Sequence, residues 1–436
     1  MRKLKQSLLV IALLAVSAWS FAAGKTEEKA VAAPAADKNI TLTIAASQNW
    51  LKEIDREISK DFTAETGIKI DIQVNPDDQY PAILQTKMNT GETPDIFYYS
   101  AGLTLKKLPL DKVLDLSQEP WAKRMKDWAV KGSTIDGRLV ALNLWSVDGW
   151  AFVYNTALFD KLGLKAPTNY SELLAVCETI KKNGVVPIYE LVGDMWHTPL
   201  YLNQAAADAS MNNPGLYEKL NTNKAKFAEI KEFQLCVSRM KEMADKGYLG
   251  ETYMSNTWTN AIEAVGTGKY AMFFGYTSWQ NEVARDYPQS GANNFKMFPS
   301  PLGVEGTAKS FATSAGGTVA LINKDSKNVE AAKKYFEYRT RPEVLKKYYD
   351  QRADLNSNPS FPEVEAKPTV GLSSISKQVN NNFLADAQAG VLFYDLMPIG
   401  EEMQSMFAGV ITPEQALKNI DAYRAKIGKS AGITGF

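Results

Sequence analysis

The spacing of apolar and polar residues in the first part of the chain predicts strands and helices in alternation. Residues 39–46 are rich in β-branched side chains, as in a strand, and the helix that follows carries apolar residues at helical spacing until Gly67. Residues 68–74 alternate between apolar and polar, and residues 80–89 and 96–99 continue the series as a helix and a strand. This order predicts a parallel sheet covered by helices, and such sheets bind ligands beyond the carboxyl ends of their strands.

The rest of the chain alternates long helices with short apolar strands. Further helices are expected at residues 169–182, 227–243, 329–336 and 413–427. The last helix has the clearest start, with Thr412 as its cap, Pro413 in its first turn and Gln415 in the capping-box position. We find no internal repeat and no clear linker, which favours a fold whose chain crosses between two lobes more than once.

Residues 1–22 have the pattern of a secretory signal peptide, and residues 23–38 that of a flexible leader. Basic residues precede a long apolar run, and Ser20 and Ala22 stand at the −3 and −1 positions of a cleavage site. The alternative is a membrane anchor, but a spanning helix needs about 20 apolar residues and small residues end this run early. No cysteine lies near the cleavage site, so we expect a periplasmic, soluble protein without a lipid anchor.

Charge and residue counts exclude several classes of function. Lys and Arg total 49, as do Asp and Glu, so nucleic-acid binding by a broad basic surface is not expected. His197 is the only histidine, and no ligands stand at the spacing of a zinc site, so we expect no metal and no cofactor. Cys177 and Cys236 could form a disulfide in an oxidising compartment or remain two buried thiols, and the sequence leaves both open.

Five segments place aromatic side chains beside polar ones, a combination that suits carbohydrate binding. Aromatic faces match the C–H faces of sugar rings, while Asp, Asn and Gln form hydrogen bonds with hydroxyl groups. The alternative is that these aromatics belong to the core and have satisfied polar tips. The segments are residues 46–50, 93–102, 142–155, 194–202 and 268–280.

Five motifs in order carry a resemblance to a known family. They are FTAETGIKIDI, GETPDIFYYSAG, DGRLVALNLWSVDGWAFVYNTALFDKLGLKAPTNYSELL, GTGKYAMFFGYTSW and SAGGTVALINKDSKNVEAAKKYFEY. Together they resemble the family 1 extracellular solute-binding proteins of bacterial ABC importers, which include maltose- and multiple-sugar-binding proteins. The resemblance covers nearly all of residues 40–430.

The resemblance implies a two-lobe α/β fold of the periplasmic-binding-protein kind, type II-like, in which each lobe is a mostly parallel sheet flanked by helices. Three crossovers would form the hinge, near residues 146–149, 312–316 and 372–377. Lobe one would comprise residues 39–147 plus 314–373, and lobe two residues 148–313 plus 374–436. A sugar or oligosaccharide would bind between the lobes and close them without chemistry. An ABC permease would recognise the closed form, and the protein would act as a monomer.

The resemblance also implies ligand-binding residues in both lobes. Those expected from lobe one are Gln48, Asn49, Trp50, Tyr98, Tyr99, Ser100, Trp145, Gly316, Gly317, Arg352 and Asp354. Those expected from lobe two are Asp148, Trp196, His197, Trp279, Tyr394 and Asp395. Two alternatives stay open: His197 could be a structural hydrogen-bonding residue, and Tyr98 and Tyr99 alternate on a strand, so that one of them would face the ligand. Trp150 is expected in the core of lobe two.

Other functions are weighed against sugar binding. The same fold could bind iron, a polyamine or a peptide. A glycoside-processing enzyme would need two carboxylates flanking one bond. Asp148, Asp194, Asp354 and Asp395 could supply them, but no motif pairs them. There is no nucleophile elbow and a single histidine, so we expect no catalytic residues and no enzyme activity.

Overall fold

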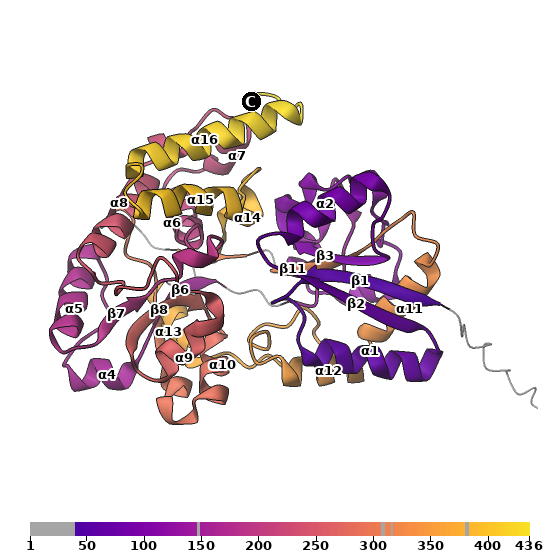
Figure 1. Cartoon of the computed structure of the whole chain (residues 1–436), viewed down its shortest axis with the longest axis horizontal. Coiled ribbons are helices and arrows are strands. Elements are labelled where there is room, and N and C mark those ends of the chain that lie inside the picture. The colour runs from indigo at the N-terminus through magenta and orange to yellow at the C-terminus, as the bar shows by residue number, and fades with distance from the viewer. Residues whose placement is uncertain (1–39, 146–148, 307–309, 315–316, 380–382) are drawn as a thin grey trace, which may run out of the picture. The chain divides into compact units, whose positions relative to one another are not determined.

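The computed structural model describes residues 40–145, 149–306, 310–314, 317–379 and 383–436 (Figure 1). The predicted signal peptide (1–22) and leader (23–38) lie outside the described residues, as do the candidate ligand residues Asp148 and Gly316. None of the helices in the described ranges combines the length and the apolar character needed to cross a membrane.

The predicted series of strands and helices at the start of the chain is present. β1 (Thr41–Ser47) pairs in parallel with β2 (Lys69–Asn75) and with β3 (Ile96–Ser100), while α1 (Glu53–Thr66) and α2 (Tyr80–Thr90) connect them. A fourth strand, β11 (Thr318–Ile322), comes from far along the chain and pairs antiparallel with β3. The sheet order is β11-β3-β1-β2, and this sheet is mostly parallel, as predicted.

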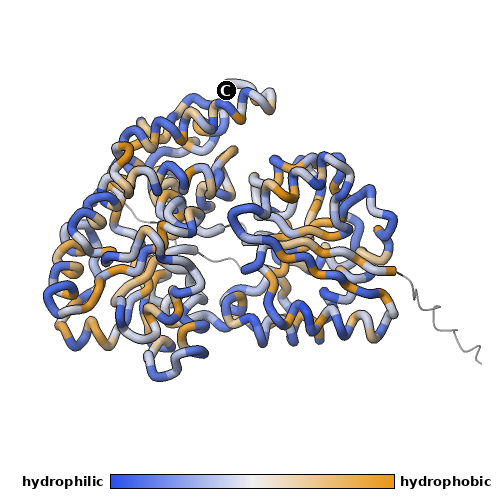
Figure 2. Tube along the Cα trace, in the orientation of Figure 1, coloured by the Kyte–Doolittle hydropathy of each residue, from blue (hydrophilic) through white to orange (hydrophobic). Residues whose placement is uncertain are grey.

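Helices cover both faces of this first sheet because β1 is apolar on both sides. Ile44 of β1 packs in one cluster with Ile58 of α1, together with α11 (Val329–Arg339) and α12 (Pro342–Gln351). Ala45, on the opposite face, packs with Leu84 of α2. Figure 2 shows the hydrophobic residues concentrated along the strands, and we call these two clusters together the first core.

A second sheet has the order β7-β8-β6-β9. Its strands are β6 (Trp150–Tyr154), β7 (Val186–Tyr189), β8 (Tyr270–Tyr276) and β9 (Lys296–Phe298). β7 and β8 are parallel, but β6 is antiparallel to both β8 and β9, so the prediction of a mostly parallel sheet is wrong here. The reason is that a strand buried on both faces is a continuous apolar run in either direction, so its sequence carries no information about direction.

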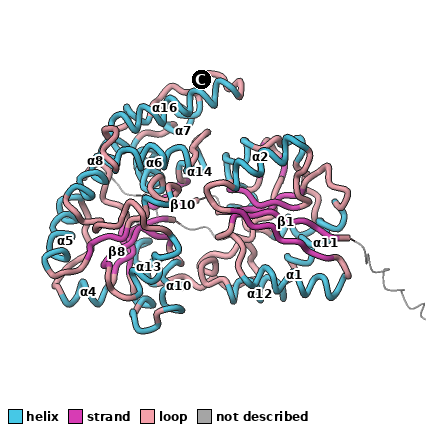
Figure 3. The backbone as a smooth tube through the Cα atoms, in the orientation of Figure 1, coloured by secondary structure: helices cyan, strands magenta, loops and turns pink. Residues whose placement is uncertain are grey.

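Helices again cover both faces of the second sheet (Figure 3). One face packs against α5 (Tyr170–Lys182), α6 (Leu200–Asn212), α8 (Lys231–Asp245), α15 (Leu396–Phe407) and α16 (Pro413–Ser430). The other packs against α9 (Ala261–Gly266), α10 (Trp279–Asp286) and α13 (Val370–Gln378). These two clusters form the second core. Thr412 caps α16 as predicted, since its hydroxyl accepts a hydrogen bond from the N–H of Gln415 at 3.1 Å.

Short elements complete the described chain. The strands are β4 (Thr134–Ile135), β5 (Arg138–Leu139), β10 (Phe311–Thr313) and β12 (Phe383–Ala385), and the short α-helices are α3 (Asp127–Gly132), α4 (Thr156–Lys161), α7 (Leu216–Asn221) and α14 (Ala387–Gly390). The 3-10 turns are η1 (Gly102–Lys107), η2 (Leu110–Lys112), η3 (Pro120–Arg124), η4 (Val192–Asp194), η5 (Phe227–Glu229), η6 (Trp258–Asn260), η7 (Pro288–Ser290) and η8 (Ala292–Asn294). Cys177 and Cys236 are both free and buried, and burial raises the pKa of each thiol.

The segments that connect the two cores agree in part with the expected crossovers. β10 and β12 pair in parallel, and Gly149 forms a bridge with Thr313, so two expected crossovers meet here, although residues 146–148 and 315–316 are outside the described ranges. The third was expected at residues 372–377, but this stretch lies inside α13 and Ile375 is part of the second core. The domain boundaries given above stay a prediction.

Candidate functional site

Four partly exposed aromatic rings gather at one edge of the second sheet. Trp150 opens β6 and pairs in register with Tyr276 at the end of β8. Because β7 runs parallel to β8, the chain leaves β7 at the same edge and reaches Trp196 just after η4. Trp258 opens η6 and completes the group, in which five pairs of ring centroids lie 5.4 to 6.1 Å apart. We call Trp150, Trp196, Trp258 and Tyr276 the aromatic platform.

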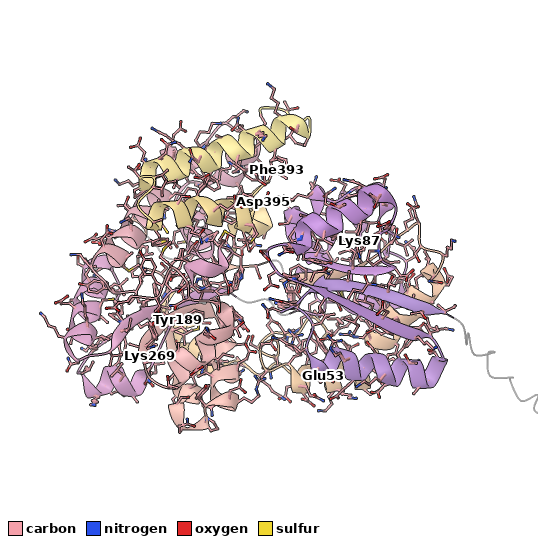
Figure 4. The ribbon with its side chains drawn as sticks, in the orientation of Figure 1. Glu53, Lys87, Tyr189, Lys269, Phe393 and Asp395 are labelled. Carbon is pink, nitrogen blue, oxygen red and sulfur yellow. The ribbon has the colours of Figure 1, made fainter. Side chains whose placement is uncertain are left out.

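Polar contacts to the backbone hold Trp258 in this position. Tyr189 of β7 (Figure 4) donates a hydrogen bond to the carbonyl oxygen of Thr257 at 2.8 Å. The side-chain amide of Asn256 donates to the carbonyl oxygen of Glu190 at 2.9 Å, and the N–H of Trp258 donates to the carboxylate of Asp194 at 2.5 Å. The loop that presents Trp258 is therefore fixed to the end of β7.

His197 lies fully buried beneath the platform. Its Nδ1 is 2.7 Å from a carboxylate oxygen of Glu190, and its Nε2 is 2.8 Å from the carbonyl oxygen of Phe274. The carbonyl can only accept, so Nε2 carries a proton, and a second proton lies between Nδ1 and Glu190. Tyr201 donates to the other oxygen of Glu190 at 2.6 Å. His197 is thus a structural hydrogen-bonding residue. It has no exposed surface with which to make the predicted ligand contact.

Trp279 was also predicted to contact the ligand, but the structure places it in the core. It is 0 % exposed, and its ring packs on Phe273 with centroids 4.4 Å apart, because the first residue of α10 faces the second sheet. The partly exposed tryptophan nearby is Trp258, which the sequence analysis missed. The available signal was its isolation among polar residues, from Asn256 to Asn260, outside any amphipathic pattern.

Acidic residues border the aromatic platform. Asp194 is partly buried beside Trp196 and Trp258; burial raises the pKa of its carboxyl group, and Asp77 and Asp78 add to the rise. Tyr276 donates a hydrogen bond to Glu282 at 2.7 Å. Burial also raises the pKa of Glu282, and Asp354 adds to that rise. The rings are therefore accompanied by hydrogen-bond acceptors.

The carboxyl ends of β1 and β2 bring a second group of polar residues together. Ser47 and Asn49 both donate hydrogen bonds to the carboxylate of Asp77, which follows β2 and was missed by the sequence analysis. Its position directly after a strand was the available signal. Trp50 is partly exposed and packs edge-on against Tyr80, with centroids 5.4 Å apart, while Gln48 is exposed.

The two tyrosines of β3 alternate as expected. Tyr99 is 8 % exposed and packs in one cluster of the first core, whereas Tyr98 is partly exposed and packs against the other. Ser100 is partly exposed and pairs with Thr318 of β11. Two adjacent tyrosines on opposite faces cannot bind one ion together.

Four predicted residues do come together around Trp145. The guanidinium group of Arg352 lies 5.1 Å from the ring centroid of Trp145 and binds both carboxylate oxygens of Asp354, at 2.8 and 2.7 Å. Gly317 has a φ of +46°, and a Cβ there would come within 2.2 Å of Trp145. Trp145 thus packs between the buried ion pair of Arg352 and Asp354 and the backbone of Gly317, and it remains partly exposed.

Tyr394 and Asp395 were predicted to contact the ligand, but in the structure their side chains contact other residues of the protein. Tyr394 is 2 % exposed and donates to the carbonyl oxygen of Pro199 at 2.5 Å. The carboxylate of Asp395 (Figure 4) forms an ion pair with Lys107 and accepts a hydrogen bond from Tyr423. In the described ranges, no three His, Cys, Asp or Glu residues are arranged to hold a metal ion.

Sequence comparison finds a family and several relatives. The family model described as bacterial extracellular solute-binding protein matches residues 45–346. The multiple sugar-binding protein of Streptococcus mutans serotype c is 22% identical over 311 residues, which cover 69% of this chain and 72% of that protein. A probable sugar-binding periplasmic protein of Brucella suis biovar 1 is 26% identical over 165 residues, 36% of each chain.

Solved structures with the same fold include three carbohydrate-related proteins. A sugar transporter protein from Bacillus licheniformis in complex with stachyose has a TM-score of 0.73 and 21% identity, covering 89% of this chain and 100% of that one. The binding protein RafE in complex with raffinose has a TM-score of 0.73, 18% identity and coverages of 89% and 99%. A chitin oligosaccharide binding protein has a TM-score of 0.74, 18% identity and coverages of 89% and 98%. This likeness confirms the predicted two-lobe α/β fold.

Proposed function

The chain belongs to the bacterial extracellular solute-binding protein family, and we propose that it binds a sugar or oligosaccharide between its lobes and delivers it to an ABC permease. The lobes would close around the solute because the closed form binds it better than the open form. Lobe one would comprise residues 39–147 plus 314–373, and lobe two residues 148–313 plus 374–436. The protein would be exported, periplasmic and monomeric.

The aromatic platform is the observation that carries this proposal. A core aromatic ring is normally covered, whereas Trp150, Trp196, Trp258 and Tyr276 each keep part of their surface exposed. Aromatic rings bury a large area against the C–H faces of a sugar. The carboxylates of Asp194 and Glu282 accept hydrogen bonds, so the platform offers both kinds of contact that a sugar needs.

The names of the relatives support the same ligand class. The multiple sugar-binding protein of Streptococcus mutans and the stachyose and raffinose complexes all concern carbohydrates. A binding protein needs no catalytic group, and we propose that this chain carries out no reaction. Of the carboxylates that a glycosidase could use, Asp354 is bound to Arg352 and Asp395 to Lys107.

Titration of the protein with a panel of mono-, di- and oligosaccharides tests the proposal. We expect at least one carbohydrate to raise the melting temperature, since a ligand that binds only the folded protein stabilises it by mass action. Replacing Trp196 by Ala should weaken that affinity about tenfold or more, on the order of 1.4 kcal/mol.

Trp128→Ala is the matched control. Trp128 is also partly exposed, but it packs against the first core from α3, so its loss should leave the affinity unchanged. Equal affinities of the Trp196 variant and the wild type, with both folded, would exclude the platform as the sugar site. A panel without any binding carbohydrate would refute the proposed ligand class.

A further inference from the structure

Some buried carboxylates of the described chain pair with arginine, whereas Asp194 at the aromatic platform does not. Asp55 pairs with Arg339 at 3.0 Å, and Asp354 pairs with Arg352 at 2.7 Å. By contrast, the hydrogen-bond donor that the structure gives Asp194 is the backbone N–H of Trp258, which is neutral.

Asp77 shares this property with Asp194. Its two donors are the hydroxyl of Ser47 and the amide of Asn49, and neither carries a charge. In the part of the chain that the structure describes, neither Asp77 nor Asp194 forms an ion pair with Lys or Arg.

The charges around Asp194 add to this imbalance. Asp77 and Asp78 are close enough to act on Asp194 and raise its pKa in addition to the effect of burial. A charge on His197 would oppose this rise, but that ring is buried and already bonded to Glu190. In the described ranges, Asp194 and Asp77 therefore carry negative charge that no ion pair with Lys or Arg balances.

The rings of the platform favour the same kind of ligand. The face of an indole or phenol ring is negative, so a cation near Trp196 and Trp258 is attracted to it. A hydroxyl group would gain only a hydrogen bond at Asp194, whereas an ammonium group would gain that bond and the charge interaction.

We propose that the carbohydrate bound here is an amino sugar with a free primary amine, whose ammonium group contacts Asp194 between Trp196 and Trp258. This inference rests on the proposed function, because it names the sugar class for the same site. The choice of an amino sugar rests on charge complementarity between its ammonium group and Asp194. A neutral sugar and a simple polyamine are the alternative ligands of this site.

Three trisaccharides with the same β-1,4 linkage provide the test. Cellotriose has a hydroxyl at each C2, the chitosan trimer has a free amine there, and the chitin trimer has a neutral acetamide. Calorimetry, at a pH where the amine is protonated and Asp194 is ionised, should give the chitosan trimer at least about tenfold tighter binding than cellotriose. Its affinity should also fall more than that of cellotriose as salt is added, because salt screens charge interactions.

Asp194→Asn is the decisive variant, since an asparagine oxygen can still accept the N–H of Trp258. We expect it to weaken chitosan-trimer binding about tenfold and to leave cellotriose within about twofold. Asp160→Asn, which changes an exposed aspartate on α4, is the control and should change neither affinity.

Each other outcome has a distinct meaning. If cellotriose or the chitin trimer binds as tightly as the chitosan trimer, the amino-sugar inference is overturned and the proposed sugar function stands. If putrescine binds and no carbohydrate does, both the inference and the proposed function are overturned.

Discussion

His197 shows how one residue stabilises the platform without touching a ligand. Removing its ring by His197→Ala would leave the carboxylate of Glu190 and the carbonyl of Phe274 buried without their partner. We expect this to lower the free energy of unfolding by about 2–4 kcal/mol, measured by urea denaturation.

Glu190→Gln is the companion variant to His197→Ala. The glutamine oxygen can still accept from Tyr201, so the loss should be smaller than for His197→Ala. A His197→Ala protein as stable as the wild type would show that this network does not contribute to stability.

At the same scale, the sequence predicts the residue types of the site better than their exposure. Trp145 and Trp196 are partly exposed, as a ligand contact requires, whereas Trp279 is covered by its own core. Whether a tryptophan is covered depends on which way its helix or loop faces the sheet. That direction is set by tertiary packing, and the local pattern around Trp279 and Trp258 does not contain it.

At the scale of secondary-structure elements, α14 begins with a buried aspartate, Asp386, as its N-cap. The carboxylate of Asp386 accepts the N–H of Ala389 at 2.7 Å, yet the side chain is 2 % exposed, and burial raises the pKa of Asp386 to about 7. Its unfolded pKa is about 3.9, so between these values the folded protein binds more protons than the unfolded chain. Asp386 therefore lowers stability progressively as the pH rises from about 4 to about 7.

Asp386→Asn tests this, because asparagine also caps helices but cannot ionise. We expect the variant to gain stability over the wild type as the pH rises through this window, by about 4 kcal/mol above pH 7. Urea denaturation at several pH values measures the difference. Asp127→Asn, at an exposed position in the first turn of α3, should show no such gain. A pH-independent difference between Asp386→Asn and the wild type would contradict the expected ionisation.

Elements made by neighbouring segments were predictable, and those made by distant segments were not. The series from β1 to β3 follows from local periodicity, and Gly67, with a φ of 78°, ends α1 as expected. The antiparallel partner of β3 lies more than 200 residues later, in β11. Its pairing depends on the return of the chain to the first sheet, which local periodicity does not encode.

At the scale of the whole molecule, an ion pair joins the two cores. Lys107 ends η1, next to Leu105 and Leu108 of the first core, while Asp395 precedes α15 of the second. Asp395 is 5 % exposed and its carboxylate contacts both Lys107 and Tyr423. A carboxylate this deeply buried requires a partner, since desolvation without compensation is costly.

Lys107→Met would keep most of the apolar stem of the side chain and remove the charge that balances Asp395. We expect the free energy of unfolding to fall by about 2 kcal/mol, because the buried carboxylate would keep its hydrogen bond from Tyr423 but lose its ion pair. Lys346→Met is the control: Lys346 pairs with Asp350 on the exposed surface of α12, where such a pair contributes about 0.5 kcal/mol or less. Equal losses for the two variants in urea denaturation would mean that the ion pair between the cores is no stronger than a surface pair.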